Sequence, residues 1–159
     1  MTMLLLIPFA FLQLSFHDSL PVQTDLQGLY AEMSQAALLT GSTDAEIDDF
    51  HDVLCTTDWV FIDMHGGRHD WQDMREQTVR LLTGPPLDSM VQTIQQLALA
   101  PDRATVIVQM TTVRSLVGAR ATERTFFRDT WVETPEGWKL KSREQLTPAK
   151  EFAVPLEGH

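Results

Sequence analysis

The stretch DWVFIDMHGGRHDW, residues 58–71, gathers the side chains of this sequence that are best able to do chemistry. It holds three aspartates, two histidines and two tryptophans. Asp63 stands at the end of an apolar run, where an aspartate can act as a general base, bind a metal ion or form the polar end of a strand. The residues alone leave these three interpretations of Asp63 open.

A second carboxylate, Asp129, lies in another aromatic and β-branched segment. Because successive side chains of a strand point to opposite faces, Asp63 and Asp129 each share a face with two aromatic residues. These residues are Trp59 and Phe61 beside Asp63, and Phe127 and Trp131 beside Asp129. If both faces line one interior, two carboxylates lie there among aromatic rings. A structural role, such as a hydrogen bond to a neighbouring Arg or Tyr, is the alternative for Asp129.

The histidines near Asp63 suggest a metal, but their spacing is not specific for zinc. We therefore expect no metal site, and we expect His65 and His69 to be solvated loop residues and His51 to lie exposed on a helix. The only cysteine, Cys55, can form no internal disulfide. We expect it to be a buried structural thiol.

Three segments show the apolar spacing and the end signals of helices. Capping boxes predict the first two helix starts, and an N-cap aspartate predicts the third. The expected helices are 24–41 with Thr24 and Gln27, 42–54 with Thr43 and Glu46, and 70–84 with Asp70.

The remaining segments are typical of strands. The expected strands are 58–65, 87–100, 103–115, 121–135 and 137–146, the last two joined by the turn sequence TPEG. The order is helix, helix, strand, helix and then four strands. Helices first and strands after predict an α+β fold with helices on one face of a mainly antiparallel sheet.

The net charge of −10 and the pI near 4.7 argue against nucleic-acid and anionic-membrane partners. No Gly-rich phosphate loop is present, so no cofactor is expected. The first sixteen residues carry no charge, and segment 1–20 is a candidate signal peptide without a basic start. A secreted or periplasmic location is therefore expected. The alternatives are an uncleaved membrane-associated segment, or a domain-capping helix in a cytoplasmic protein. Residues 148–159 are expected to be a surface tail.

Residues 24–147 resemble the nuclear transport factor 2-like superfamily, which includes ketosteroid isomerases and SnoaL-type cyclases. The resemblance rests on the element order, the Gly-Gly pair after the first strand, and the closing sequence RDTWVETPEGWKLKSREQL. It implies a strongly curved sheet wrapped against three helices, a cone with an apolar pocket, and a homodimer through the outer sheet face. Arg124 and Arg128 would lie on that outer face or on a solvated one.

The ketosteroid isomerases within this superfamily add a possible mechanism. The spacing from Asp58 to Asp63 resembles that of their general base, and the spacing from Asp129 to Gly137 resembles that of their protonated hydrogen-bond donor. The isomerase tyrosine has no match, because Ser34 occupies its position. Tyr30, one turn earlier, is the tentative substitute.

Three functions follow from the resemblance. The first is the binding of a small apolar molecule in the cone. The second is a cofactor-free isomerase, cyclase or dehydratase that uses Asp63, Asp129 and Tyr30. The third is a dimeric interaction module. The pocket-lining residues would be Met33, Trp59, Phe61, Phe127 and Trp131, although aromatic residues at such positions also form cores.

Overall fold

The computed structural model describes residues 14–38 and 42–146, and every element below lies within those ranges. They contain three helices and six strands. The bounds are Leu14–Leu38 for α1, Asp44–Leu54 for α2, Cys55–Ile62 for β1, Arg68–His69 for β2, Trp71–Thr83 for α3, Ser89–Ala100 for β3, Arg103–Leu116 for β4, Ala119–Thr134 for β5 and Gly137–Leu146 for β6.

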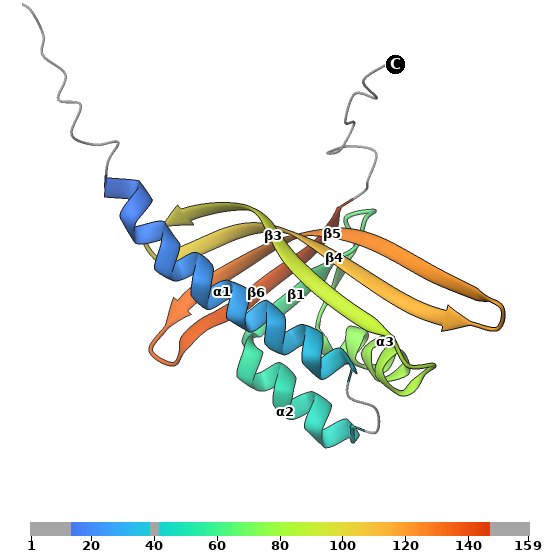
Figure 1. The fold of residues 1–159 in the computed structure, drawn as a ribbon. Helices are drawn as coiled ribbons and strands as arrows, with labels where there is room; N and C mark the ends of the chain where they lie inside the picture. Colours follow the sequence, from blue (N-terminus) through green and yellow to red (C-terminus); the bar gives the residue numbers. More distant parts are fainter. Residues whose placement is uncertain (1–13, 39–41, 147–159) are drawn as a thin grey trace, which may run out of the picture.

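The six strands form one sheet in the spatial order β2-β1-β6-β5-β4-β3. β1 and β6 are parallel, and the other neighbouring pairs are antiparallel. The long strands are curved, and α1 runs across one face of the sheet with α2 and α3 on the same side (Figure 1). The expected α+β fold, with helices on one face of a curved and mainly antiparallel sheet, is confirmed.

The starts of α2 and α3 follow the capping chemistry of the sequence. The hydroxyl of Thr43 accepts the N–H of Glu46 at 3.3 Å, and the Glu46 carboxylate accepts the N–H of Thr43 at 2.7 Å. Asp70 and Asp73 form the same reciprocal pair at the start of α3. Both predicted helix starts are therefore confirmed.

The predicted start of the first helix at Thr24 is wrong. α1 already begins at Leu14, and the Thr24 hydroxyl donates to the carbonyl oxygen of Leu20 at 2.9 Å. A threonine inside a helix can satisfy its hydroxyl in this way, so the capping pattern did not mark a helix end. Gln27, the expected capping partner, donates instead to the carbonyl oxygen of Gln92 on β3 at 3.0 Å.

Five of the six strands were predicted from the sequence, although the bounds of β1 differ from the predicted range 58–65. The Gln-rich segment 87–100 forms β3, and the TPEG turn joins β5 to β6 with Gly137 at a φ of +109°. β2 was not predicted, because two residues carry no alternation that could reveal a strand. β1 begins at Cys55, three residues before the predicted start.

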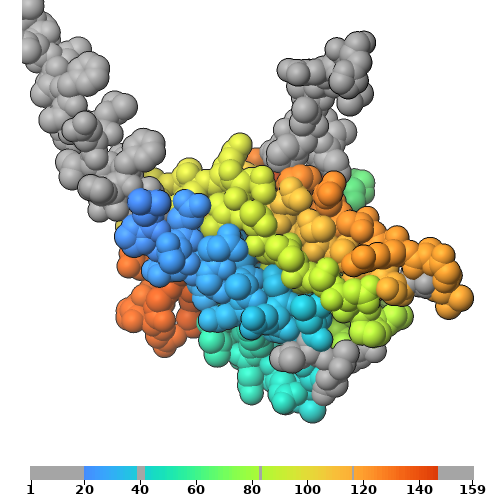
Figure 2. All heavy atoms as spheres, viewed as in Figure 1, coloured from blue at the N-terminus to red at the C-terminus, as the bar shows by residue number. Residues whose placement is uncertain are grey.

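The core lies between α1 and the inner face of the sheet. Leu26 and Tyr30 of α1 are fully buried, as are Val106 and Val108 of β4 and Trp131 of β5. The space-filling view shows α1 lying directly against the strands behind it (Figure 2). Burial of this apolar surface is what fixes the helix on the sheet.

Parts of the expected domain organisation lie outside the described residues. They are residues 1–13 of the candidate signal segment 1–20, and the whole of the expected tail 148–159. Residues 14–20 belong to α1. Among the described helices, none is both long enough and apolar enough to span a membrane.

Candidate functional site

Asp129 lies in the centre of the core and is completely buried. The hydroxyl of Tyr30 donates to its Oδ2 at 2.7 Å. Arg143 of β6 donates from Nε to Oδ1 at 2.9 Å and from Nη2 to Oδ2 at 2.7 Å. This two-point ion pair is the strong form of an Arg–carboxylate contact. The carboxylate of Asp129 therefore accepts three hydrogen bonds.

Tyr30 connects this carboxylate to the aromatic core. Its oxygen accepts a hydrogen bond from Nε1 of Trp131 at 2.9 Å while its proton points to Asp129. The rings of Tyr30 and Trp131 pack edge to face, with their centroids 5.5 Å apart. Burial, and then the negative charge of Asp129, raise the pKa of Tyr30, so the phenol stays protonated.

Arg143 compensates the buried charge. Burial opposes the ionisation of Arg143, but the charge and the hydrogen bonds of Asp129 outweigh it, and the pKa of Arg143 is raised. Nη2 also donates to Oε1 of Gln92 at 3.0 Å, and the guanidinium carbon lies 4.6 Å from the ring centroid of Phe127. Gln92 in turn donates to Oγ of Ser34 on α1 at 3.4 Å. The cluster thus joins α1, β3, β5 and β6.

The isomerase-type roles of Asp129 and Tyr30 do not fit this geometry. That mechanism needs a protonated carboxyl group that donates a hydrogen bond to the substrate oxygen. In the structure both oxygens of Asp129 accept bonds, and the proton of Tyr30 is committed to Asp129. The carboxylate of Asp129 is bound by a neighbouring arginine and a neighbouring tyrosine. These contacts favour the structural interpretation of Asp129.

Asp63 closes the turn after β1. Its Oδ1 accepts the backbone N–H groups of His65 and Gly67, both at 2.8 Å, and its Oδ2 lies 2.9 Å from Nε2 of His69. The bond from His69 first, and then the bond from Gly67, lower the pKa of Asp63 to about 2. A general base that works near neutral pH needs a higher pKa. The contacts therefore favour the strand-end interpretation of Asp63.

The two aspartates sit in separate surroundings. Phe61 pairs with Arg143, which pairs with Asp129, so β6 lies between the strands of Asp63 and Asp129. Neighbouring strands lie about 4.8 Å apart. The hydrogen-bond partners of Asp63 and those of Asp129 have no residue in common.

His69, which we expected in a loop, forms part of β2 and is half-buried, whereas His65 is exposed. Among the described residues, no group of three His, Cys, Asp or Glu is placed to hold a metal ion.

Comparison with known proteins identifies the architecture. No family model and no curated protein matches the sequence. Solved structures do match. A protein of unknown function in nutrient uptake from Rhodospirillum rubrum, described as nuclear transport factor 2-like, shares 25% identity over 76% of this chain and 96% of its own, with a TM-score of 0.52. The chain has the nuclear transport factor 2-like fold.

Two further neighbours with this fold share still less sequence. A nuclear transport factor 2-like protein from Novosphingobium aromaticivorans shares 17% identity over 88% of this chain and 90% of its own, with a TM-score of 0.57. The association domain of CaMKII from C. elegans shares 15% identity over 82% of this chain and 99% of its own, with a TM-score of 0.56. Structural similarity at such low sequence identity shows a shared fold but does not show a shared function.

The expected pocket-lining residues belong to the core of this nuclear transport factor 2-like domain. Trp131 is fully buried and Phe127 is 6% exposed. Met33, Trp59 and Phe61 are partly buried and pack against the same cluster. Around Asp129, the interior of the cone is thus filled by side chains of the protein itself.

A hollow lies elsewhere, between α2, β1 and α3. His51 is wrongly predicted as exposed, because its side chain is only 11% exposed. Its ring stacks on the ring of Trp71, with 3.9 Å between the centroids, and packs edge to face on Trp59, with 5.2 Å between the centroids. Helical spacing placed His51 on the polar side of α2, and only the packing of α3 shows that this side is covered.

The outer face of the nuclear transport factor 2-like sheet is less buried than the inner face. The described helices contact the inner face, where Tyr30, His51 and Trp71 meet Asp129 and Trp59. The outer side chains of the four central strands are only partly buried. They include Val60, Ile62, Thr105, Ile107, Phe126, Arg128, Thr130, Val132, Ser142 and Glu144.

Proposed function

We propose that this chain is an association module that pairs with a second copy through the outer face of its sheet. The observation that carries the proposal is the partly exposed apolar strip on that face. Val60, Ile62, Ile107, Phe126 and Val132 all point away from the side that the described helices cover. A sheet face with this many apolar residues is normally packed against another layer.

The charges of the outer face suit pairing with an identical face. Arg128 and Glu144 lie side by side in its middle, with Nη1 and Oε2 2.9 Å apart. In a two-fold pair the same patch of each copy meets the other, so an arginine beside a glutamate can be complementary to itself. The chain as a whole carries −10, and a balanced patch is where two such chains can approach with the least repulsion.

The other two functions have less support. A cone that binds an apolar molecule needs space in its interior, but the interior around Asp129 is filled and carries a buried ion pair. Proton transfer by Asp63 needs a higher pKa than about 2. One structural neighbour is an association domain, which supports the association function at the level of the fold.

Sedimentation velocity of the purified chain over a range of concentrations tests this proposal. We expect a dimer at micromolar concentrations. The variant Ile107→Arg places a charge in the middle of the outer face and should give a monomer with an unchanged circular dichroism spectrum. A wild-type chain that stays monomeric at the highest soluble concentration would refute the proposal.

The matched control is Leu81→Arg. Leu81 is an exposed apolar residue of α3, with 48% of its surface accessible, and it lies on the helical side. The control adds the same charge and removes a similar apolar side chain. We expect it to remain dimeric. Dissociation by both variants would assign the effect to net charge rather than to the outer face.

A further inference from the structure

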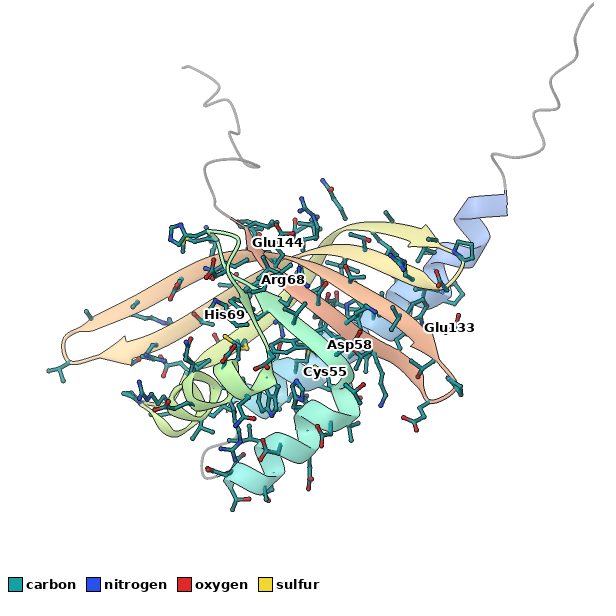
Figure 3. All side chains as sticks on the ribbon, turned by 180° about the vertical axis from the view of Figure 1, so that it is seen from behind. Cys55, Asp58, Arg68, His69, Glu133 and Glu144 are labelled. Atoms are coloured by element: carbon teal, nitrogen blue, oxygen red, sulfur yellow. The ribbon has the colours of Figure 1, made fainter. Side chains whose placement is uncertain are left out.

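The hollow between α2, β1 and α3 combines aromatic rings with an excess of carboxylates. It has a volume of about 790 Å³. His51, Trp59 and Trp71 line it, and these three rings contact one another. The charged lining residues are Asp48, Asp52, Asp58, Asp70 and Arg75. We name this place the α2–α3 hollow. Figure 3 labels Asp58, which lines it, and Cys55, which begins the same strand β1.

Among the described residues, two of the four lining carboxylates, those of Asp52 and Asp70, have no ion pair to lysine or arginine. Asp48 accepts two bonds from Arg75, at 2.8 Å each, and one from Trp71 at 3.1 Å. Asp58 pairs with Lys141, and Asp70 caps α3. Asp52 is different, because its side chain is 78% exposed and its carboxylate has, among the described residues, one ring nitrogen of His51 within 4 Å. Lys139 lies nearby, but its Nζ donates to the backbone carbonyl oxygen of Asp52, at 3.5 Å.

His51 provides an independent sign that the hollow is a site. Its side chain is about nine-tenths buried, yet neither imidazole nitrogen makes a hydrogen bond with the described residues. The closest carboxylate oxygen, Oδ1 of Asp52, is 3.5 Å from Nδ1. A buried polar side chain without a partner is rare and requires a reason. Because burial also lowers the pKa of His51, the ring stays uncharged near neutral pH and leaves the hollow net negative.

We propose that the α2–α3 hollow binds a small organic cation of the quaternary ammonium type. The negative faces of indole rings attract such a cation most strongly among aromatic side chains. The apolar substituents of the cation would pack against Trp59 and Trp71, and its charge would be balanced by Asp52. An anion would meet the carboxylates of the lining, and an uncharged ligand would gain nothing from them.

Choline and its uncharged isostere, in which carbon replaces the nitrogen, provide the direct test. The two probes have the same shape and differ in one charge. The indole N–H resonances of Trp59 and Trp71, followed by NMR, should shift during titration with choline, while the resonance of the buried Trp131 should stay in place. We expect the isostere to bind at least about tenfold more weakly.

Two aspartates of α2 provide a matched pair of variants. Asp52→Asn removes the lining carboxylate, whereas Asp49→Asn removes the same charge from an exposed residue of α2 that does not line the hollow. We expect Asp52→Asn to weaken choline binding about threefold and Asp49→Asn to leave it unchanged. Both residues are on the surface, so neither variant should unfold the chain.

Three results would overturn the proposal. They are the absence of any shift at Trp59 and Trp71 with choline, equal binding of choline and its uncharged isostere, and equal effects of the two aspartate variants. None of these results depends on the oligomeric state, so the hollow and the association function can fail separately.

Discussion

Tyr30 on α1 donates a 2.7 Å hydrogen bond to Asp129 on β5, a residue 99 positions later in the chain. The same phenol oxygen accepts the indole N–H of Trp131, and the same carboxylate holds Arg143. One polar cluster at the centre of the core therefore ties the first helix to the last two strands. Clusters of this kind stabilise a fold only while every member has its partner.

Replacing Tyr30 by Phe should destabilise the chain by about 2 kcal/mol. The change removes one hydroxyl and leaves the buried N–H of Trp131 without an acceptor. Urea unfolding followed by circular dichroism measures the effect. Thr122→Val, which removes a hydroxyl from an exposed position of β5, is the control and should change stability by less than about 0.5 kcal/mol. Equal effects of the two variants would mean that the Tyr30 hydroxyl contributes nothing specific.

Asp129 and Arg143 should be strongly coupled in a double-mutant cycle. Asp129→Leu leaves a guanidinium that is only 12% exposed without its counter-charge, and should cost about 3–5 kcal/mol. Arg143→Met should cost a similar amount. The double variant Asp129→Leu with Arg143→Met should recover much of the loss, because a buried pair replaced by apolar residues is often neutral. Additive losses in urea unfolding would contradict the coupling.

The carboxyl group of Asp63 should titrate near pH 2 rather than near its ordinary value of 3.8. The folded-state pKa lies below the unfolded one, so Asp63 stabilises the fold above about pH 4. That contribution is lost as the pH falls from about 4 towards 2. NMR of the side-chain carboxyl carbon measures the midpoint directly.

The histidines near Asp63 offer a matched comparison for this titration. His69→Leu should raise the midpoint of Asp63, because it removes the side-chain contact to Oδ2. His65→Ala should leave the midpoint unchanged, because His65 donates to Asp63 only from its backbone. Gly67→Ala should also raise it, since a Cβ at Gly67 would lie 2.4 Å from Oδ2 of Asp63 and push the carboxylate away. Equal midpoints in the two histidine variants would reject this account of the pKa.

The thiol of Cys55 should be inert in the folded chain. Burial raises its pKa to about 12, and the residue is 6% exposed. We expect no reaction with a disulfide reagent at pH 8 until denaturant is added. Thr57→Cys in a Cys55→Ser background, which places a thiol at an exposed position of the same strand, should react at once. Rapid labelling of native Cys55 would show that the start of β1 opens.

The fold could be predicted from the sequence because its signals are local. The capping boxes at Thr43 and Asp70 and the turn at Gly137 each act within a few residues. The start of α1 was missed because Thr24 satisfies its hydroxyl inside the helix, which no local pattern distinguishes from a cap. The burial of Cys55 was also predicted correctly.

The partners of the candidate site residues depend on contacts between distant segments. Asp129 was singled out, but its partner Arg143 was not, although an arginine in the middle of a strand is a visible signal. Counting back from the turn, where Thr134 pairs with Gly137, would place Asp129 opposite Ser142. The pairing shifts by one between Thr130 and Trp131, so Arg143 becomes the partner instead. Nothing in the local sequence announces that shift.

The shift adds a residue to β6 without changing which side chains face the interior. Lys141 has no partner on β5, yet Leu140 before it and Arg143 after it both face the core, opposite Trp131 and Asp129. Deleting Lys141 would move every later residue of β6 one position closer to the turn, so the simple count would again place Arg143 opposite Asp129. The extra residue instead supplies a surface lysine whose Nζ lies 3.2 Å from Asp58 on the neighbouring strand β1. Loss of this one residue should therefore cost an exposed ion pair and leave the charge pair at the centre intact.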